Sequence, residues 1–509
     1  MKNILYYLHS FLFAAIAPIY VYVSYPEMHI YIGPDSIWRL VFLSVLFFLF
    51  LTCVFFLLLR EHLSAGLIST CLILGVLYPR YPFLFIVGAI LLASLLLAIP
   101  RKTLDLRHAF VASTAISVVI ALYVGIEYVQ ARQISYSFPA SSMADPVEIK
   151  TPASELNYKP DIYYIILDAY AGETMLKKLH GFDNSMFTSA LKQRGFVVPS
   201  ASRSNYLRTI HSLGSSLNMQ YLNHMSEIMG SSSLWWPLRE LFINSETRRF
   251  LESQGYKTAI VASGWDFTTI TDADTYKQPF PVFLNDFEEF FVGNTNVSLF
   301  DSLADTWVSF PSYDTHRRIV LYEFEQLKNL PELDSPQFTF VHIVSPHPPF
   351  VFDAEGNPIN PDYPFTIVDN RYLIRPPSKY QQGYLDQLTF VNAQVLAVVD
   401  AILEKSTNPP IIILQGDHGP GTFLDSQSYS PPCFYERYSI LNAYYLPGQD
   451  PSTVPQDITP VNTFRMILND YFAADLELLP NHQYFSTPDL IHQFKDVTAL
   501  TDNACIFPN

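Results

Sequence analysis

Positive charge is scarce in this sequence. Its 509 residues include 31 Lys and Arg against 47 Asp and Glu, so the formal net charge is −16 at pH 7. Proteins that bind nucleic acid present a basic face, and this balance therefore argues against DNA or RNA as a partner. It also argues against broad electrostatic adhesion to anionic lipid. The chain has neither a G-x-G-x-x-G fingerprint nor a P-loop, so two nucleotide-binding motifs are absent.

Cysteine is also scarce, with only 4 in the chain. Cys53 and Cys71 lie in apolar segments, whereas Cys433 and Cys505 lie in the C-terminal part. If that part is outside the cytoplasm, a disulfide between Cys433 and Cys505 is allowed, because disulfides persist in oxidising compartments. Two unpaired thiols are the alternative.

Charged residues are rare in the first 126 positions, which are rich in long apolar runs. A membrane-spanning helix needs about 20 apolar residues, and a signal peptide would account for the first run alone. We predict five spans, with four as the alternative because the third run is short. The runs are Ile4–Val23, Leu40–Leu59, Leu63–Leu77, Pro82–Ile99 and Ala109–Ile126.

The basic residues between these runs indicate an orientation. If the spans alternate, Lys2, Arg60 and the basic cluster within 101–107 fall on one side, which the positive-inside rule makes the cytoplasmic side. We therefore predict a multi-pass protein of a bacterial-type inner membrane. Its transmembrane domain is 1–126, a linker follows at 127–157, and an extracytoplasmic domain extends over 158–509.

Strand and helix patterns alternate in this third part. Strands are predicted at Asp161–Tyr170, Phe196–Ala201 and Tyr256–Ser263, and later in "QFTFVHIVSPHPPF" and "PPIIILQGDHGPG". Helices are predicted between them, the longest in "QQGYLDQLTFVNAQVLAVVDAILEK", where apolar residues recur at helical spacing. Alternation of this kind predicts parallel βαβ units in an α/β sheet, with polar sites at the carboxyl ends of the strands.

Polar residues follow three of the predicted strands. Asp168 follows "YYIIL", His347 follows "FTFVHIVSP", and Asp417 and His418 follow "IIILQG". Parallel strands would bring all of them to one edge of the sheet, where carboxylates and imidazole suit a divalent cation. Taken singly, such residues are more often turn, cap or loop residues than metal ligands. Together they predict a metal site.

Three stretches resemble the sulfatase branch of the alkaline phosphatase superfamily: "PDIYYIILDAY", "FVHIVSPHPPF" and "YLDQLTFVNAQVLAVVDAILEKSTNPPIIILQGDHG". That branch opens its domain with a strand ending in an acidic metal ligand. A Pro-His-x-Pro segment follows, then a long helix and a strand ending in Asp-His-Gly. The resemblance covers roughly 158–470, and it implies an alkaline phosphatase/sulfatase-like α/β domain with a mostly parallel central sheet and flanking helices.

The family also needs a nucleophile on the turn into a helix. Sulfatases use Cys or Ser in C/S-x-P-x-R, a motif that this chain lacks. The matching stretch, "SRSNYLRTIHSLGSSLNMQYL", offers Thr209, and its Thr-x-x-Ser-Leu pattern is similar to the nucleophile segment of membrane phosphoethanolamine transferases. Lipoteichoic acid synthases likewise use a Thr after a five-helix anchor. A helix cap is the alternative role for Thr209, and the alternative nucleophiles are Ser204, Ser212 and Ser215.

The resemblance implies a role for each candidate residue. Asp168, Asp417 and His418, with Thr209, would hold one divalent cation, for which Zn or Mn suits the mixed ligands better than Ca. A single metal is favoured because Ala169 stands where many sulfatases have a second acid. His347 would bind the phosphoryl group or protonate the leaving alcohol. The substrate would also be touched by Asn205 and Arg208, whereas His211 and His342 are expected to be structural.

The predicted activity is transfer of a phosphoryl-alcohol group, phosphoglycerol or phosphoethanolamine, through a covalent phospho-threonine. The donor would be a membrane phospholipid and the acceptor an envelope glycan or lipid. One alternative is a hydrolase of phosphate or sulfate esters. A second alternative is an inactive envelope scaffold of the same fold.

Overall fold

The computed structural model describes residues 4–26, 28–78, 106–136, 147–150, 159–298, 304–369, 373–423, 433–502 and 505. These residues form two compact units. Unit 1 contains residues 1–138 and a later segment, 282–310, whereas unit 2 contains 139–281 and 311–509. The boundaries predicted at 126 and 157 stay predictions, but the membership of 282–310 in unit 1 could not be foreseen from the order of the sequence.

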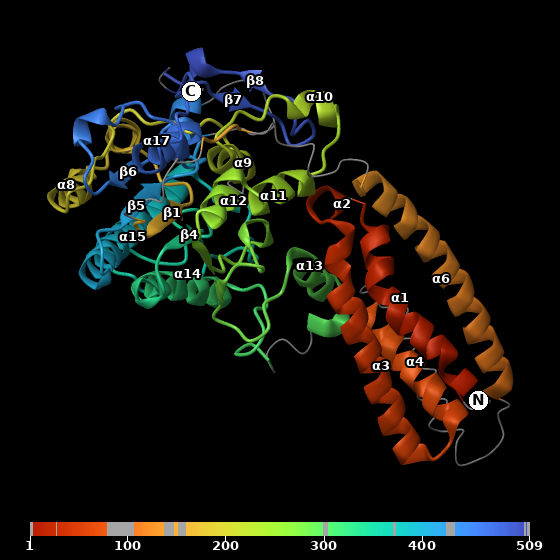
Figure 1. Ribbon diagram of the computed structural model, residues 1–509. Helices are drawn as coiled ribbons and strands as arrows, with labels where there is room; N and C mark the ends of the chain where they lie inside the picture. The colour runs from red at the N-terminus through yellow and green to blue at the C-terminus, as the bar shows by residue number, and fades with distance from the viewer. Residues whose placement is uncertain are drawn as a thin grey trace. The chain divides into compact units, whose positions relative to one another are not determined.

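Unit 1 is built from long apolar helices (Figure 1). Their bounds are α1 Leu8–Ser24, α2 Met28–Tyr31, α3 Trp38–Leu59, α4 His62–Leu77 and α6 Leu106–Tyr136. By length and composition, three helical segments could each cross a membrane: Leu5–Ser24, which includes α1, Pro34–Leu59, which includes α3, and Ala109–Ile134 within α6. Helix α4 is a shorter apolar helix. The predicted span Pro82–Ile99 lies outside the described residues.

The later segment of unit 1 carries helix α13 (Asp286–Asn294). Its buried Phe287 and Phe291 belong to one hydrophobic cluster with Tyr22 and Tyr128 from the N-terminal helices. Arg39 forms an ion pair with the fully buried carboxylate of Glu288. An aromatic and ionic contact of this kind ties α13 to the helices that precede the α/β unit in the chain.

The core of unit 2 is a six-stranded sheet in the order β3-β2-β4-β1-β5-β6. All neighbours pair in parallel except β6, which is antiparallel to β5. The strands are β1 Ile162–Leu167, β2 Lys257–Val261, β3 Thr275–Lys277, β4 Gln337–Ile343, β5 Ile411–Gln415 and β6 Asn442–Tyr445. The prediction of a mostly parallel α/β domain is therefore confirmed.

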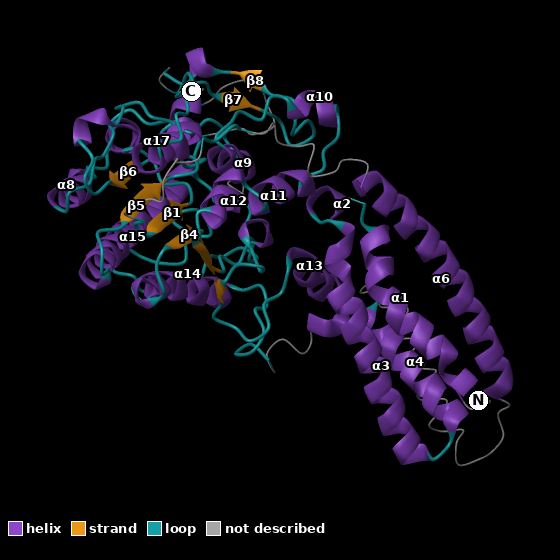
Figure 2. Cartoon of the chain, in the orientation of Figure 1, coloured by secondary structure: helices purple, strands orange, loops and turns teal. Residues whose placement is uncertain are grey.

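Helices cover both faces of this sheet (Figure 2). One face packs in a hydrophobic core with α7, α8, α14 and α15. On the other face, Tyr164 packs against Phe464 of α17, with ring centroids 5.0 Å apart, and its hydroxyl meets Ser216 of α9. Burial on both faces explains why β1 is apolar along its whole length rather than alternating.

Helix α15 (Pro377–Lys405) is also long and apolar enough to span a membrane by composition alone. Its apolar stripe is instead buried in the core of unit 2. The remaining helices of unit 2 are α7 Glu173–His180, α8 Ser185–Gln193, α9 Thr209–Asn218, α10 Met225–Met229, α11 Trp236–Ile243, α12 Glu246–Ser253, α14 Tyr313–Leu327, α16 Phe434–Tyr438 and α17 Pro460–Phe472.

The strand predicted at Phe196–Ala201 is wrong. Only Val197 pairs there, in a single antiparallel bridge to Tyr444 at the edge of the sheet. Pro199 has no N–H to donate to a ladder, which limits pairing at this position. The segment is a connection that touches β6.

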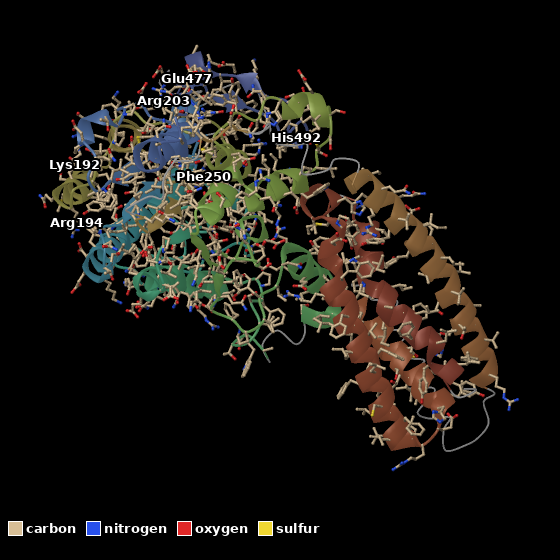
Figure 3. The ribbon with its side chains drawn as sticks, in the orientation of Figure 1. Lys192, Arg194, Arg203, Phe250, Glu477 and His492 are labelled. Carbon is tan, nitrogen blue, oxygen red and sulfur yellow. A yellow bond between two sulfur atoms is a disulfide. The ribbon has the colours of Figure 1, made fainter. Side chains whose placement is uncertain are left out.

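The end of the chain is fastened to unit 2 at several points. Cys433 and Cys505 form a disulfide. Arg203, labelled in Figure 3, donates to the hydroxyl of Thr501 at 3.2 Å and pairs with Asp502. A two-stranded ribbon, β7 Tyr484–Phe485 and β8 Lys495–Asp496, lies in the same part of the chain. Of the two possibilities left open for these cysteines, the structure has the disulfide.

Candidate metal and nucleophile site

Three neighbouring strands place their carboxyl ends together. In the order β4-β1-β5, β1 runs into Asp168, β5 runs into Asp417 and His418, and β4 runs into the loop with His347. The backbone N–H of His347 donates to the Asp168 carbonyl at 3.0 Å. Adjacent parallel strands therefore bring together residues that are about 250 positions apart, as expected for this class of sheet.

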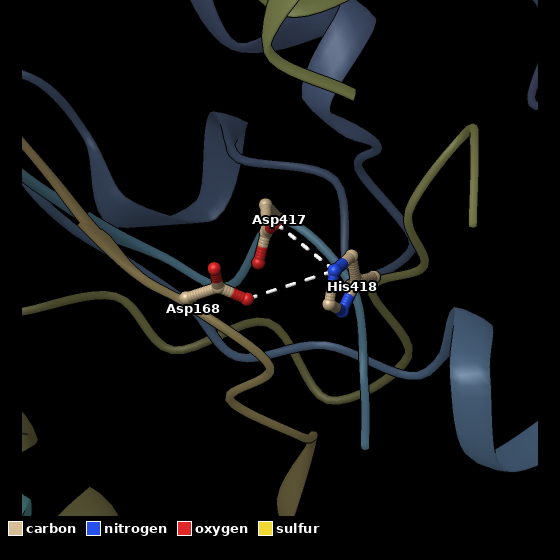
Figure 4. Close-up of side chains that lie close together, drawn as sticks. All are labelled: Asp168, Asp417 and His418. Atoms are coloured by element: carbon tan, nitrogen blue, oxygen red, sulfur yellow. Dashed lines mark ion pairs between the residues drawn. The ribbon is translucent and has the colours of Figure 1, made fainter. Parts of the chain in front are cut away.

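Asp168, Asp417 and His418 form a compact buried cluster (Figure 4). One ligand atom from each lies within 4.8 Å of the others. His418 Nε2 is 3.3 Å from Asp417 Oδ2 and 3.6 Å from Asp168 Oδ1. The cluster thus presents two carboxylate oxygens and one ring nitrogen to a common point.

Tight backbone turns position these side chains. Ala169 has φ of +61°, and its N–H donates to Asp417 Oδ1 at 3.1 Å. A Cβ on Gly416 would lie 2.3 Å from the carbonyl oxygen of Tyr170, and a Cβ on Gly419 would lie 2.0 Å from that of Glu436. Gly416 is therefore required for the ends of β5 and β1 to approach each other, and Gly419 for the loop after β5 to approach the segment Phe434–Tyr438.

Thr209 lies at the start of α9, beside the cluster. Its Oγ1 is 3.2 Å from His418 Nε2. The N-cap residue is Arg208, and the structure shows no side-chain capping bond at this end of α9. Thr209 is the first helical residue rather than the cap, so its hydroxyl is aimed at the cluster instead of at the backbone of its own helix.

The pKa values of the two acids in the cluster are shifted in opposite directions. Burial would raise the pKa of Asp168, but the neighbouring imidazoles of His347, His342 and His418 lower it overall. Burial and the charge of Asp168 raise the pKa of Asp417 to about 6. For His418, burial and then the charge of Arg437 lower the pKa well below its usual value. The imidazole is therefore neutral at pH 7, the form that binds metals.

The donor set fits a divalent cation. His418 Nδ1 is 3.0 Å from the Gly419 carbonyl, which assigns the proton to Nδ1 and leaves the Nε2 lone pair facing the acids. Asp168 Oδ1 and Asp417 Oδ2 are buried and accept no hydrogen bond within the described part of the chain. Three electron-rich atoms turned toward one another are costly to bury unless a cation lies between them.

His347 lies near this cluster, and its ring is 6.2 Å from that of His418, centroid to centroid. The other two predicted substrate residues are engaged with backbone groups. Asn205 donates to the His482 carbonyl at 2.9 Å and accepts from Val461 N–H at 2.9 Å. Arg208 donates to the Ser486 carbonyl at 2.7 Å. Substrate contact by Asn205 and Arg208 stays a prediction.

The alternative serine nucleophiles have other partners. Ser204 donates to the Asp417 carbonyl at 2.5 Å, and its Oγ lies 3.3 Å from Ser212 Oγ. Ser215 donates to the Gln220 carbonyl at 2.7 Å. Among these hydroxyls, only that of Thr209 reaches His418 in the described residues.

His342, which the sequence suggested was merely structural, touches the cluster directly. Its Nε2 is 3.2 Å from Asp168 Oδ2, and its Nδ1 is 3.0 Å from Thr268 Oγ1. It lies within β4, in register with Ile166 of β1. The sequence does show a histidine in an apolar strand. Its closeness to Asp168 could be inferred only once the pairing of β1 with β4 was known.

Arg437 of α16 was missed because no motif marks it. Its Nη2 is 3.1 Å from His418 Nε2, and its Nε donates to the Leu207 carbonyl at 2.9 Å. The guanidinium thus bridges the loop after β5 and the segment leading into Thr209. An arginine here supplies planar donors suited to a phosphate or sulfate oxygen.

The family follows from a sequence comparison. The sulfatase family model matches residues 160–499, more than half of the chain. The chain belongs to the sulfatase family. Sulfatase-family proteins are enzymes of the alkaline phosphatase superfamily, and the predicted superfamily is confirmed. No curated protein matches the sequence.

Solved structures similar to this sulfatase-family chain include three phosphoethanolamine-transferase-type proteins. The zinc complex of the periplasmic domain of EptC from Escherichia coli has a TM-score of 0.44 at 11% identity, covering 69% of this chain and 96% of that one. EptA from Neisseria meningitidis, an integral membrane lipooligosaccharide phosphoethanolamine transferase, has a TM-score of 0.41 at 12% identity, covering 91% of this chain and 95% of that one. The periplasmic domain of EptC from Campylobacter jejuni, a phosphoethanolamine transferase, has a TM-score of 0.38 at 11% identity, covering 64% of this chain and 92% of that one. Similarity at TM-scores of this size does not identify a substrate for this chain.

Proposed function

We propose that this sulfatase-family protein is a membrane-bound, metal-dependent phosphoryl-alcohol transferase. Thr209 would carry phosphoglycerol or phosphoethanolamine covalently between a phospholipid donor and a hydroxyl of an envelope glycan or lipid. The observation that supports this best is the Thr209 hydroxyl 3.2 Å from His418 Nε2, at the edge of a buried Asp/Asp/His cluster. A threonine hydroxyl needs such activation because it is a weak nucleophile at neutral pH.

Asp168, Asp417 and His418 would hold one divalent cation, Zn or Mn, next to the Thr209 hydroxyl. When bound, that ion supplies a lowered hydroxyl pKa and neutralisation of charge on the phosphoryl oxygens. His342 keeps the Asp168 carboxylate oriented through its 3.2 Å contact. Partners of this type around the ligands tune both the geometry and the affinity of a metal site.

The chemistry at the residues balances in two displacement steps. The Thr209 hydroxyl loses its proton to solvent, and its Oγ forms a bond to phosphorus while the bond to the alcohol of the lipid breaks and His347 gives a proton to that alcohol. The acceptor hydroxyl then bonds to phosphorus and gives its proton back to His347, while the bond to Thr209 Oγ breaks and that oxygen regains a proton from solvent. Arg437 would donate to the phosphoryl oxygens, since its guanidinium already reaches His418 at 3.1 Å.

The N-terminal helices suit a lipid donor. The described part of unit 1 contains apolar helices of membrane-spanning length, which would hold the enzyme in the membrane that contains the substrate. The Cys433–Cys505 disulfide supports an oxidising compartment for unit 2. We therefore place the catalytic unit on the periplasmic or extracellular side of a bacterial-type inner membrane.

Hydrolysis of phosphate or sulfate esters is the second candidate function, and membership of the sulfatase family favours it. The absence of a C/S-x-P-x-R motif removes the usual precursor of formylglycine, so sulfate-ester cleavage by that route is not available. An inactive scaffold would gain nothing from burying two unpartnered carboxylate oxygens, which favours an enzyme.

Mass spectrometry of the purified full-length protein after incubation with lipid extract tests the proposal. We expect the mass of phosphoglycerol or phosphoethanolamine on the peptide that contains Thr209. Thr209→Ala should abolish the adduct and lower turnover by a factor on the order of 10⁴ or more, the scale of a lost nucleophile. Ser212→Ala, a buried hydroxyl one turn further along α9, is the matched control and should keep the adduct.

Two results would contradict the proposal. Full turnover in Thr209→Ala would remove Thr209 as the nucleophile. An adduct that is released only as free phospho-alcohol, with no transfer to any lipid or glycan acceptor, would support the hydrolase instead.

A further inference from the structure

Arg437 has a second partner on the side away from the metal cluster. Asp369 Oδ2 lies 3.2 Å from Arg437 Nη1, and Asp369 Oδ1 accepts from the Tyr380 hydroxyl at 3.3 Å. One guanidinium therefore separates the Asp369 carboxylate from His418, whose Nε2 is 3.1 Å from Arg437 Nη2. The contact is partly buried, with 18% of the Asp369 side chain exposed.

The loop after β5 is shaped to admit this carboxylate. A Cβ on Gly421 would lie 2.7 Å from Asp369 Oδ2, so the second glycine of "DHGPG" leaves the space that Asp369 fills. Gly421 N–H is also 3.3 Å from the Tyr380 hydroxyl. Asp369, Tyr380 and Gly421 thus lie together next to Arg437, and Asp369 brings a carboxylate to this group.

A carboxylate in this position works against an anionic substrate. The guanidinium that should attract a phosphoryl group is already neutralised by Asp369, and a phosphate brought next to it faces a like charge. A second carboxylate close to Arg437, that of Glu436 in α16, is already bound by His180 at 3.1 Å and by the Phe423 N–H at 3.1 Å. A substrate that carries its own cation beside the phosphate removes this penalty, because the cation can pair with Asp369.

We propose that Asp369 determines donor specificity by binding the ammonium of a zwitterionic head group. This inference rests on the proposed function and narrows it: the transferred group is an aminoalkyl phosphate such as phosphoethanolamine, and phosphoglycerol is disfavoured. Arg437 Nη1 is directed at Asp369 and at the Gly419 carbonyl, so a phosphoryl oxygen takes the N–H of Nη2 that is not directed at His418. The two-carbon linker then carries the amine toward the Asp369 carboxylate on the other side of the guanidinium. Specificity of this kind comes partly from repulsion of the wrong ligand.

The test measures binding of short-chain phosphatidylethanolamine and short-chain phosphatidylglycerol to the full-length protein in detergent, by titration calorimetry. Thr209→Ala is the common background, so no turnover occurs. In this background we expect tighter binding of the ethanolamine lipid, and Asp369→Asn should weaken it by roughly tenfold while leaving glycerol-lipid binding equal or tighter. Asp362→Asn is the matched control, because Asp362 is in the same connection but pairs with Lys379 on the surface.

A change in the ligand gives a second measurement that does not depend on the variant folding. N-acetylation of the ethanolamine lipid removes its positive charge and keeps its phosphate. In the Thr209→Ala background this should weaken binding by roughly tenfold, and in Asp369→Asn the two lipids should bind alike. Equal binding of the charged and the acetylated lipid in the background protein would overturn the inference.

Asp369 could instead only hold Arg437 in place. In that case Asp369→Asn would weaken binding of both lipids by the same factor, and the inference would be wrong. The outcome is separate from that of the proposed function, because the proposed function fails if the unaltered protein forms no adduct on Thr209. Lipid binding in the Thr209→Ala background decides the role of Asp369 whether or not that adduct is found.

Discussion

At the scale of the residue, the two acids of the cluster are chemically different although both are buried. The surrounding imidazoles lower the pKa of Asp168, whereas burial and the charge of Asp168 raise that of Asp417 to about 6. Asp168 is therefore ionised across the physiological range. Asp417 is therefore the proposed ligand at which a proton would compete with a cation.

This difference predicts how metal binding depends on pH. In the metal-free protein, Asp417 must lose a proton before it can bind a cation, so the apparent affinity should fall about tenfold per pH unit below about pH 6. Above that pH this effect should level off. Competition with a chromophoric chelator between about pH 5 and pH 7 measures it, and a flat profile would contradict the assignment.

The raised pKa of Asp417 also makes the stability of the metal-free protein depend on pH. Stability falls as the pH rises, whereas the affinity for a cation increases. Because the pKa of Asp417 is raised in the folded state, its contribution to stability is full below its ordinary value and is lost as the pH rises through about 6. A bound cation reverses this preference. Asp417→Asn serves as the control, since its side chain does not titrate and it should lose this pH dependence of the stability of the metal-free protein.

At the scale of the element, short segments position the site while long helices supply the core. Helix α16 (Phe434–Tyr438) brings Arg437 to His418, and the disulfide at Cys433 lies directly before it. The disulfide joins residues 72 positions apart, and closing a loop of that length is worth about 4 kcal/mol in the chain-entropy account. By contrast, the long helix α14 carries an acidic side chain, Glu323, within the buried core.

Glu323 of α14 is fully buried, and neither carboxylate oxygen has a hydrogen-bond partner in the described residues. Burial raises its pKa well above the usual value, so the side chain is protonated at neutral pH. Glu323→Leu should raise the free energy of unfolding by about 1–3 kcal/mol, because it removes an unsatisfied polar group. Thermal and denaturant unfolding measure the change.

The control for this variant is on the same helix. Glu325→Leu replaces an exposed acid near Lys328 and should change stability by no more than about 0.5 kcal/mol. Because the pKa of Glu323 is raised in the folded state, its contribution to stability is full below the ordinary carboxyl range and is lost as the pH rises above it, so the unaltered protein should lose stability over that rise and Glu323→Leu should not. A destabilised Glu323→Leu would mean that the carboxyl group has a partner, such as an internal water.

At the scale of the whole molecule, one segment packs with unit 1 although the sequence on both sides of it belongs to unit 2. Residues 282–310 interrupt the α/β unit in sequence but pack with the N-terminal helices. The ends of this segment meet: Val282 N–H donates to the Trp307 carbonyl at 2.9 Å, and Ser309 N–H donates to that of Val282 at 3.0 Å. The segment is an inserted loop with its own hydrophobic partner in unit 1.

This arrangement predicts how a fragment of residues 159–509 behaves. Without the N-terminal helices, Phe287 and Phe291 lose their buried partners, and exposed aromatic clusters promote association. Replacing residues 284–305 by a short Gly-Ser linker should therefore increase the soluble, monomeric share of the fragment. Size-exclusion chromatography of the two fragments side by side measures it.

The outcome that would contradict this prediction is an intact fragment that is already monomeric. The same replacement in the full-length protein is the control. There it should lower the thermal stability of the protein, since Glu288 and the aromatic side chains of α13 contact the N-terminal helices.

The sequence by itself determined the fold class and most of the cluster. Apolar runs ending in Asp168 and in Asp417-His418 indicate parallel strands, because a buried strand followed by a polar turn is a local pattern. Thr209 could be proposed from the order of the motifs. Its 3.2 Å contact with His418 became visible only with the fold.

Only the tertiary structure brought in His342, Arg437, Asp369 and the unit 1 membership of α13. Each depends on which strands are neighbours or on where a loop returns, and no local pattern encodes such long-range contacts. Periodicity records which face of an element is buried, but it does not say what covers that face. The proposed metal and nucleophile residues can therefore be predicted from local motifs, whereas the residues proposed to orient them and to select the substrate are placed by tertiary packing.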